Sequence, residues 1–142
     1  MRIAMLLLLA SFVAAPLQAH ECTNSEAAAA DAASDSWHSW RSVFSAYKMY
    51  GQCDQGAPGE AFTDSIVHLL ATRWSSLHQV QALIKQRPSF QEFVVRHIDA
   101  TADYGELVRV ARFANTRCPA SATLVCKQIA VAAKSAITES NR

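Results

Sequence analysis

The chain has few residues that interrupt helices: only four of its 142 residues are glycine and only four are proline. Three of the four glycines lie close together, between residues 51 and 59. The alternation of apolar and polar residues that marks a half-buried strand is also missing. The run Phe93-Val94-Val95 would suit a strand, but it lies inside a helical pattern. The sequence therefore predicts an all-α fold, a compact bundle of five to six short helices.

Several motifs typical of enzymes and cofactor proteins are missing as well. The sequence contains no CxxC, which excludes a thiol-exchange motif, and no CxxCH, which excludes covalent haem attachment. It also lacks the HExxH zinc motif and the GxSxG nucleophile elbow. With every cysteine expected in a disulfide, no motif selects a nucleophile. We therefore predict no cofactor, no catalytic residues and no enzyme activity.

Net charge is nearly absent, at +1 for the whole chain. Because a nucleic-acid binder normally carries a basic excess, nucleic acid is not an expected partner. The charges are nonetheless unevenly distributed: residues 20–64 hold seven acidic and two basic residues, whereas residues 65–142 hold five acidic and ten basic residues. Such an asymmetry can orient a charged partner, although charges scattered over solvated faces would give the same counts.

The one long apolar run lies at the N-terminus. Arg2 precedes an apolar stretch from Ile3 to Ala15, and Leu17-Gln18-Ala19 is an acceptable cleavage triplet. This stretch is too short for a comfortable membrane span. We predict a signal peptide over residues 1–19 and a mature protein that is periplasmic or secreted, with no membrane association after cleavage. The mature chain is expected to comprise an N-terminal arm or short helix over 20–35 and a helical bundle domain over 36–142.

All four cysteines lie in the predicted mature chain, and an even number in an exported protein indicates two disulfides. Of the three possible pairings we favour Cys22–Cys53 with Cys118–Cys126. The short segment around Pro119 allows the second bridge to join the end of one helix to the start of the next. The first bridge would then attach the N-terminal arm to the segment around Cys53.

Apolar residues recur with a helical period in six segments beyond the arm. Capping boxes are indicated where Ser76, Ser89 and Asp103 are each followed by Gln or Glu three positions later. The expected helices cover approximately residues 36–50, 58–74, 76–87, 89–98, 103–118 and 121–138.

The segment between residues 51 and 60 is the longest one expected to be non-helical, and we predict that it binds a partner. It would be fixed by a disulfide and would lead into a helix start that carries acidic residues. The alternative is a plain connector whose acidic residues complement the helix dipole. The candidate partner-binding residues are Asp54, Gln55, Glu60 and Asp64.

The five histidines raise the alternative of a metal-binding protein. Cleavage after Ala19 would make His20 the mature N-terminus, where its amino group and imidazole could chelate copper if a further imidazole lay near. None of the other four histidines stand three or four positions apart, the spacing that aligns ligands on a helix. We predict no metal site, with His20 as the candidate to test, and we expect His97 to be a hydrogen-bonded histidine at the edge of the core.

A hydrolase of unrecognised type is the third hypothesis. Asp64 and His68 lie one helical turn apart, so the carboxylate could orient the imidazole as a general base. A glycosidase would need two carboxylates across a cleft, and nothing in the sequence selects such a pair from Asp54, Glu60, Asp99 and Asp103.

A resemblance to a known class rests on the export signal, the helical build and the motifs YGQCDQGAPGEAF, FVVRHID and CPASATLVC. With these features the chain resembles small periplasmic helical proteins of Gram-negative bacteria, among them the immunity proteins that neutralise type VI secreted cell-wall amidases. The resemblance covers residues 36–138 and assigns no individual binding residue. It implies a periplasmic inhibitor, in some cases a homodimer, that blocks the active-site cleft of a secreted cell-wall hydrolase with a loop or helix face.

Overall fold

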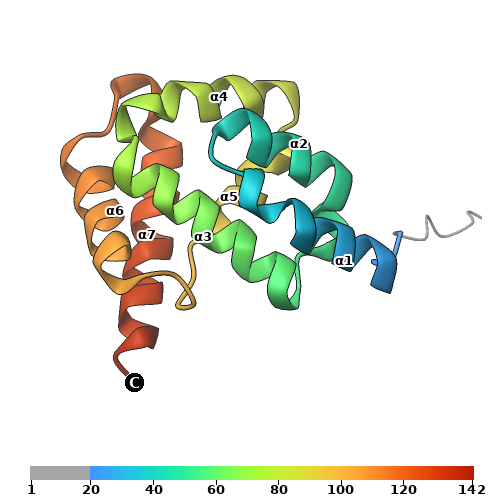
Figure 1. The fold of residues 1–142 in the computed structure, drawn as a ribbon. Coiled ribbons are helices and arrows are strands. Elements are labelled where there is room, and N and C mark those ends of the chain that lie inside the picture. The colour runs from blue at the N-terminus through green and yellow to red at the C-terminus, as the bar shows by residue number, and fades with distance from the viewer. Residues whose placement is uncertain (1–19) are drawn as a thin grey trace, which may run out of the picture.

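The computed structural model describes residues 20–142, so the predicted signal peptide lies outside the described residues. Within this range the protein contains seven α-helices, four single-turn 3₁₀ helices and no strand, which confirms the all-α prediction (Figure 1). No helix in the range is long and apolar enough to cross a membrane. The α-helices are α1 (Asn24–Ala33), α2 (Trp40–Tyr50), α3 (Gly56–Thr72), α4 (Leu77–Gln86), α5 (Ser89–Arg96), α6 (Tyr104–Thr116) and α7 (Thr123–Ser140).

The seventh helix is formed by the N-terminal arm, so the predicted count of five to six helices is wrong. Thr23 caps α1 by accepting a hydrogen bond from the backbone N–H of Glu26, and the Glu26 carboxylate accepts one from the backbone N–H of Thr23. Ala30 is fully buried and belongs to the core. This complete capping box and the packed alanine stabilise a helix whose apolar stripe is weak.

Both predicted disulfides are present. Cys22 and Cys53 are joined with their Cα atoms 4.9 Å apart, and Cys118 and Cys126 with theirs 6.0 Å apart. The first bridge attaches α1 to the 3₁₀ turn η2 (Gly51–Cys53), and the second attaches the end of α6 to the first turn of α7.

Helix α2 begins later than predicted, because Ser39 and not Ser36 is its N-cap. Residues Ser34–Ser36 form the 3₁₀ turn η1, and Trp37 follows it outside either helix. The Trp37 ring stacks on Phe62 of α3 with 4.3 Å between the ring centroids. This stacking is a long-range contact, which helical periodicity could not reveal.

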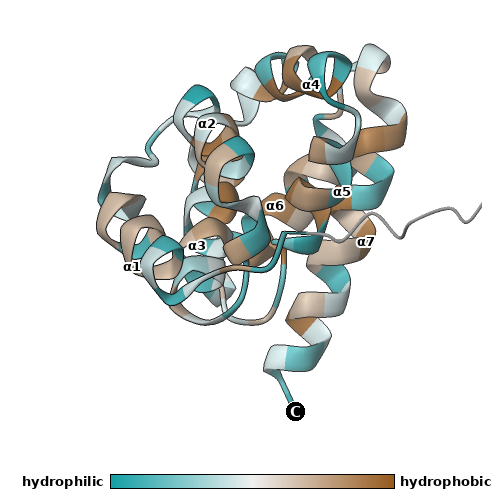
Figure 2. Cartoon of the chain, turned by 90° about the vertical axis from the view of Figure 1, so that its right-hand side faces the viewer, coloured by the Kyte–Doolittle hydropathy of each residue, from teal (hydrophilic) through white to brown (hydrophobic). Residues whose placement is uncertain are grey.

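Helix α3 crosses the middle of the molecule and contacts α1, α2 and α6 (Figure 1). At one end of the molecule α6 packs closely along α7, whose C-terminal turns extend beyond the rest of the bundle (Figures 1 and 2). The aromatic part of the core joins α2, α3 and α5: its members Phe44, Tyr47, Phe62, Phe90 and Phe93 make ring contacts with one another.

Of the three predicted capping sites, only Asp103 caps its helix, accepting a hydrogen bond from the backbone N–H of Glu106. The Ser76 hydroxyl instead accepts a hydrogen bond from the Trp40 indole N–H at 2.9 Å. The Ser89 hydroxyl bonds the hydroxyl of Tyr47 at 2.7 Å. Both capping predictions are wrong because each serine hydroxyl forms a hydrogen bond with a side chain of α2 that is distant in sequence.

Candidate protein-binding surface

The segment predicted to be a long loop is much shorter in the structure. Gly51–Cys53 is a 3₁₀ turn and α3 already begins at Gly56, so only Asp54 and Gln55 remain as a link. The link is closely held: Cys53 is bridged, Gly56 has a φ of +61° that favours glycine, and Gly59 lies against the backbone of Asp54. A Cβ atom at position 59 would approach the Asp54 carbonyl oxygen to 2.4 Å. The segment is therefore a tight corner.

Asp54 does not project from this corner as expected. Its carboxylate accepts a hydrogen bond from the Arg96 guanidinium, and its side chain is only 17% exposed. The Nε2 atom of His97 lies 3.9 Å from the same carboxylate oxygen. Asp54 thus joins the corner to the end of α5, and its charge is already balanced within the protein.

The other three candidates, Gln55, Glu60 and Asp64, are exposed. Glu60 and Asp64 lie one turn apart on α3, and neither forms an ion pair with the described residues. Partial burial raises the pKa of Asp64, and the charges of Glu60, Glu106 and Asp99 raise it further. We call Glu60, Asp64 and Glu106 the acidic ridge; it joins the outer face of α3 to the start of α6.

The arrangement does not favour the predicted pairing of Asp64 with His68. The Nδ1 atom of His68 lies 2.8 Å from a carboxylate oxygen of Glu106, on a different helix. His68 is exposed, and no hydroxyl is hydrogen-bonded to its ring among the described residues. The pair therefore links α3 to α6 at the surface, and no nucleophilic side chain of the described residues is hydrogen-bonded to the ring.

A buried polar network lies behind the corner. The Thr63 hydroxyl donates a hydrogen bond to Asp99 at 2.9 Å and lies 3.2 Å from Nδ1 of His97. Because this hydroxyl has one proton and gives it to Asp99, His97 must carry its own proton on Nδ1 and donate it to Thr63. This arrangement leaves the buried Nε2 atom of His97 without a hydrogen-bond partner. Burial, and next the charge of Arg96, lower the pKa of His97 to about 4.

This network has a structural role. His97 is 4% exposed, as predicted for a core-edge histidine, and its ring packs against Phe62 and Phe93. Sequence reasoning missed the participation of Thr63 and considered Asp99 only as one of several carboxylates that a glycosidase could use. The sequence does place three polar residues, Arg96, His97 and Asp99, at the end of α5. Because the backbone groups at a helix end need hydrogen-bond partners, such residues could have indicated a polar network there.

The described residues do not assemble a histidine brace. The imidazole of His20 is exposed and bonds Glu26 at 2.8 Å. The one group of three possible metal ligands between residues 20 and 142 is Cys22, Glu26 and Cys53. Its two sulfur atoms form a disulfide with each other and so cannot act as thiolate ligands.

Comparisons with protein-family models, curated proteins and solved structures found no match to this chain. The assignment of a binding surface therefore rests on the geometry of its own residues. Among the candidates from the sequence, the structure brings the exposed Glu60 and Asp64 near the half-buried Glu106, and it places Asp54 in an internal ion pair.

Proposed function

We propose that this protein is an exported inhibitor, of the immunity-protein kind, that occludes the active site of a secreted cell-wall-degrading enzyme. The acidic ridge and the adjoining Gln55 would make the contact. The observation that carries the proposal is the set of carboxylates around Asp64, whose mutual repulsion no basic side chain relieves at Glu60 or Asp64.

Uncompensated charge on a folded surface costs stability, and a cationic partner relieves that cost. Partial burial, and in addition the charges of Glu60 and Glu106, make the ionised form of Asp64 less favourable than in water and raise its pKa. A lysine or arginine at the rim of a target cleft would favour the ionised form again. The ridge thus suits a partner with a basic surface.

Rigidity supports the same function. The Cys22–Cys53 bridge and the tight corner fix the position of Gln55 and the first turn of α3 before any partner binds. A preformed surface loses little conformational entropy on binding, so more of the contact energy appears as affinity. The two disulfides also suit a protein that works in an oxidising compartment.

The test uses the product of the gene that adjoins this one, since an immunity protein usually adjoins its toxin. Glu60→Lys and Asp64→Lys should each weaken inhibition of that enzyme's peptidoglycan hydrolysis by about thirtyfold, the scale of a hot spot of roughly 2 kcal/mol. Glu139→Lys is the matched control, because Glu139 is an exposed acid at the end of α7. It should leave inhibition unchanged.

Asp64→Asn separates function from folding. Removing this charge should raise the melting temperature slightly, because the charge is partly buried and is repelled by Glu60 and Glu106, while it weakens inhibition. Thermal melts and inhibition assays on the same preparations give both values. If both lysine variants inhibit as well as the unmodified protein does, the ridge is not the contact surface. If the unmodified protein has no effect on peptidoglycan hydrolysis by the neighbouring enzyme, the assignment as its inhibitor is wrong.

A further inference from the structure

Helices α6 and α7 carry a surface whose charges are all of one sign. The two helices pack side by side as an antiparallel hairpin, joined at one end by the Cys118–Cys126 bridge (Figure 1). Residues 107–138 contain no acidic residue and five basic ones, all exposed: Arg109, Arg112, Arg117, Lys127 and Lys134. None of the five forms an ion pair with the described residues. This surface therefore has a positive charge that no ion pair balances.

A groove lies between the two helices within this basic surface, and we call it the α6–α7 groove. Its volume is about 300 Å³, and it is lined by Ala111, Asn115, Ala130, Val131, Lys134 and Ile137. Four of these residues are apolar, and the one charged residue, Lys134, is a cation. Val131 is 71% exposed, more than any other large hydrophobic residue that the structure describes. The groove thus combines an uncovered apolar surface with positive charge.

Two lysines flank Val131 along α7. Lys127 precedes Val131 by four positions and Lys134 follows it by three, so the three side chains lie on one side of the helix. At 1.5 Å per residue, the Cα atoms of the two lysines lie about 10 Å apart along the helix axis. The surface therefore presents two cations two helical turns apart, with an aliphatic side chain between them.

We propose that the α6–α7 groove binds an acidic helix of a partner protein. The partner helix places an aliphatic side chain against Val131 and Ile137, and two carboxylates beside Lys127 and Lys134. A helix fits because carboxylates seven positions apart recur after two turns, at the same spacing as the lysines. The inference uses no residue of the acidic ridge and does not depend on the target proposed above.

A second copy of this chain does not supply such a helix. Among the helices between residues 20 and 142, none contains two acidic residues seven positions apart. Pairing α7 with the α7 of another copy would also bring Lys127 and Lys134 close to other lysines, and like charges across an interface cost free energy. The charge pattern therefore favours a different protein as the partner.

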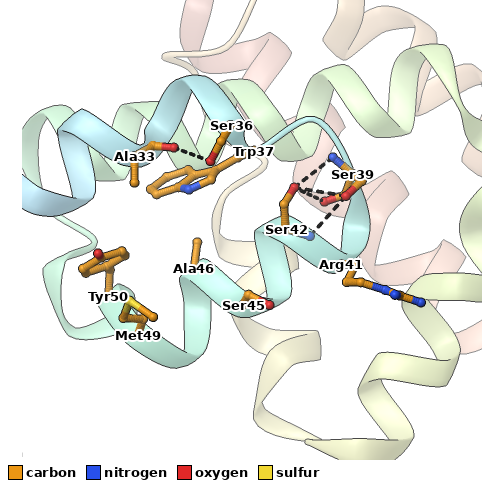
Figure 3. Close-up of a pocket in the computed structure, with 10 residues that line it drawn as sticks. All are labelled: Ala33, Ser36, Trp37, Ser39, Arg41, Ser42, Ser45, Ala46, Met49 and Tyr50. Carbon is orange, nitrogen blue, oxygen red and sulfur yellow. Dashed lines mark hydrogen bonds between the residues drawn. The ribbon is translucent and has the colours of Figure 1, made fainter.

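The hollow between α1 and α2 lacks this complementarity (Figure 3). Its lining combines apolar residues with four serines and one cation, Arg41. Three of the serines are already hydrogen-bonded within the protein: Ser36 donates to the carbonyl of Ala33, and Ser39 and Ser42 bond each other. These groups select no particular occupant, whereas the spacing of charges along α7 does.

The test measures binding of a helical peptide to the mature protein, residues 20–142 with both disulfides. The peptide is rich in alanine and glutamine, with two glutamates seven positions apart and a leucine three positions after the first glutamate. It should shift the NMR signals of the Val131 methyl groups in a saturable way. Raising the salt concentration from about 0.05 M to about 0.5 M should weaken binding, because salt screens the ion pairs.

Matched controls separate the role of charge from that of the apolar surface. A peptide with lysines in place of the glutamates should not bind, and one with alanine in place of the leucine should bind about tenfold more weakly. Lys134→Glu should weaken binding about tenfold, whereas Lys85→Glu, at an exposed lysine of α4, should not. Val131→Ser should also weaken binding, whereas Met49→Ser, at an exposed residue of α2, should not. All four substitutions are at exposed positions, so the fold should be retained.

The proposal is wrong if the glutamate peptide causes no saturable shift of the Val131 signals, or if the lysine peptide binds equally well. Equal binding with and without the leucine would also overturn it, because the groove would then have no role. Tighter binding to phosphatidylglycerol vesicles or to single-stranded DNA than to the peptide would make the basic surface a membrane or nucleic-acid site instead.

Discussion

The buried His97 makes the stability of the protein depend on pH. Its pKa is lowered to about 4, whereas an unfolded histidine titrates at 6.5. Between these two values the unfolded chain binds a proton that the folded protein excludes, so unfolding is favoured as the pH falls. Stability from this source is complete above pH 6.5 and decreases as the pH falls from 6.5 towards 4.

The size of the effect follows from the difference between the two pKa values. Each unit of difference corresponds to about 1.4 kcal/mol, so the full loss below the lower pKa is roughly 3 kcal/mol, and at about pH 5 it is roughly 2 kcal/mol. Glu26 titrates in another range, because hydrogen bonds from His20 and Thr23 lower its pKa from 4.5 to about 2. Its contribution is lost only as the pH falls from 4.5 towards 2, largely below the range of His97.

Urea unfolding at a series of pH values between about 4 and 7.5 measures this dependence. The variant His97→Asn keeps a donor near Thr63 but cannot titrate, so its free energy of unfolding should be lower at neutral pH and nearly constant across the range. His78→Asn, at an exposed histidine, should keep the pH dependence of the unmodified protein. The reasoning would be refuted if His97→Asn retained the decrease between pH 6.5 and 4, or if the unmodified protein lacked it.

Two further predictions concern the N-terminal region and metals. Replacing both Cys22 and Cys53 by serine removes a bridge with a sequence separation of 31 and should lower the free energy of unfolding by about 4 kcal/mol. The same change at Cys118 and Cys126, with a separation of 8, should lower it by about 2.5 kcal/mol. Urea unfolding measures both values, and a smaller loss at Cys22 and Cys53 would contradict the loop-length argument. Protein purified with His20 as its first residue should retain no stoichiometric copper or zinc after dialysis, because the His20 imidazole bonds Glu26 and the nearby cysteine sulfurs form a disulfide. Elemental analysis measures the metal content. Metal that is retained by this protein but lost in His20→Ala would restore the histidine-brace hypothesis.

The sequence by itself determined the helical class and the approximate positions of most helices, and it favoured the disulfide pairing that the structure contains. Helical periodicity is a local property, so the apolar stripes of the segments around Phe62 and Phe93 could be read directly. The Asp103 cap could also be predicted from the sequence, because its acceptor and donor lie three residues apart. Pairing of Cys118 with Cys126 followed from their short separation.

The tertiary structure alone decided which polar groups meet. Ser76 and Ser89 have the sequence pattern of caps, but Trp40 and Tyr47 reach their hydroxyls from α2. His68 could bond a carboxylate one turn away, but the packing of α6 on α3 gives it Glu106 instead.

Tertiary contacts also decided which of the candidate acidic residues keep an unbalanced charge. Asp54, Glu60 and Asp64 look alike in the sequence, yet Arg96 neutralises the first and Glu106 adds repulsion at the last. Hydrogen bonds and charge interactions depend on distances across the fold, and a periodic pattern along one helix does not contain those distances.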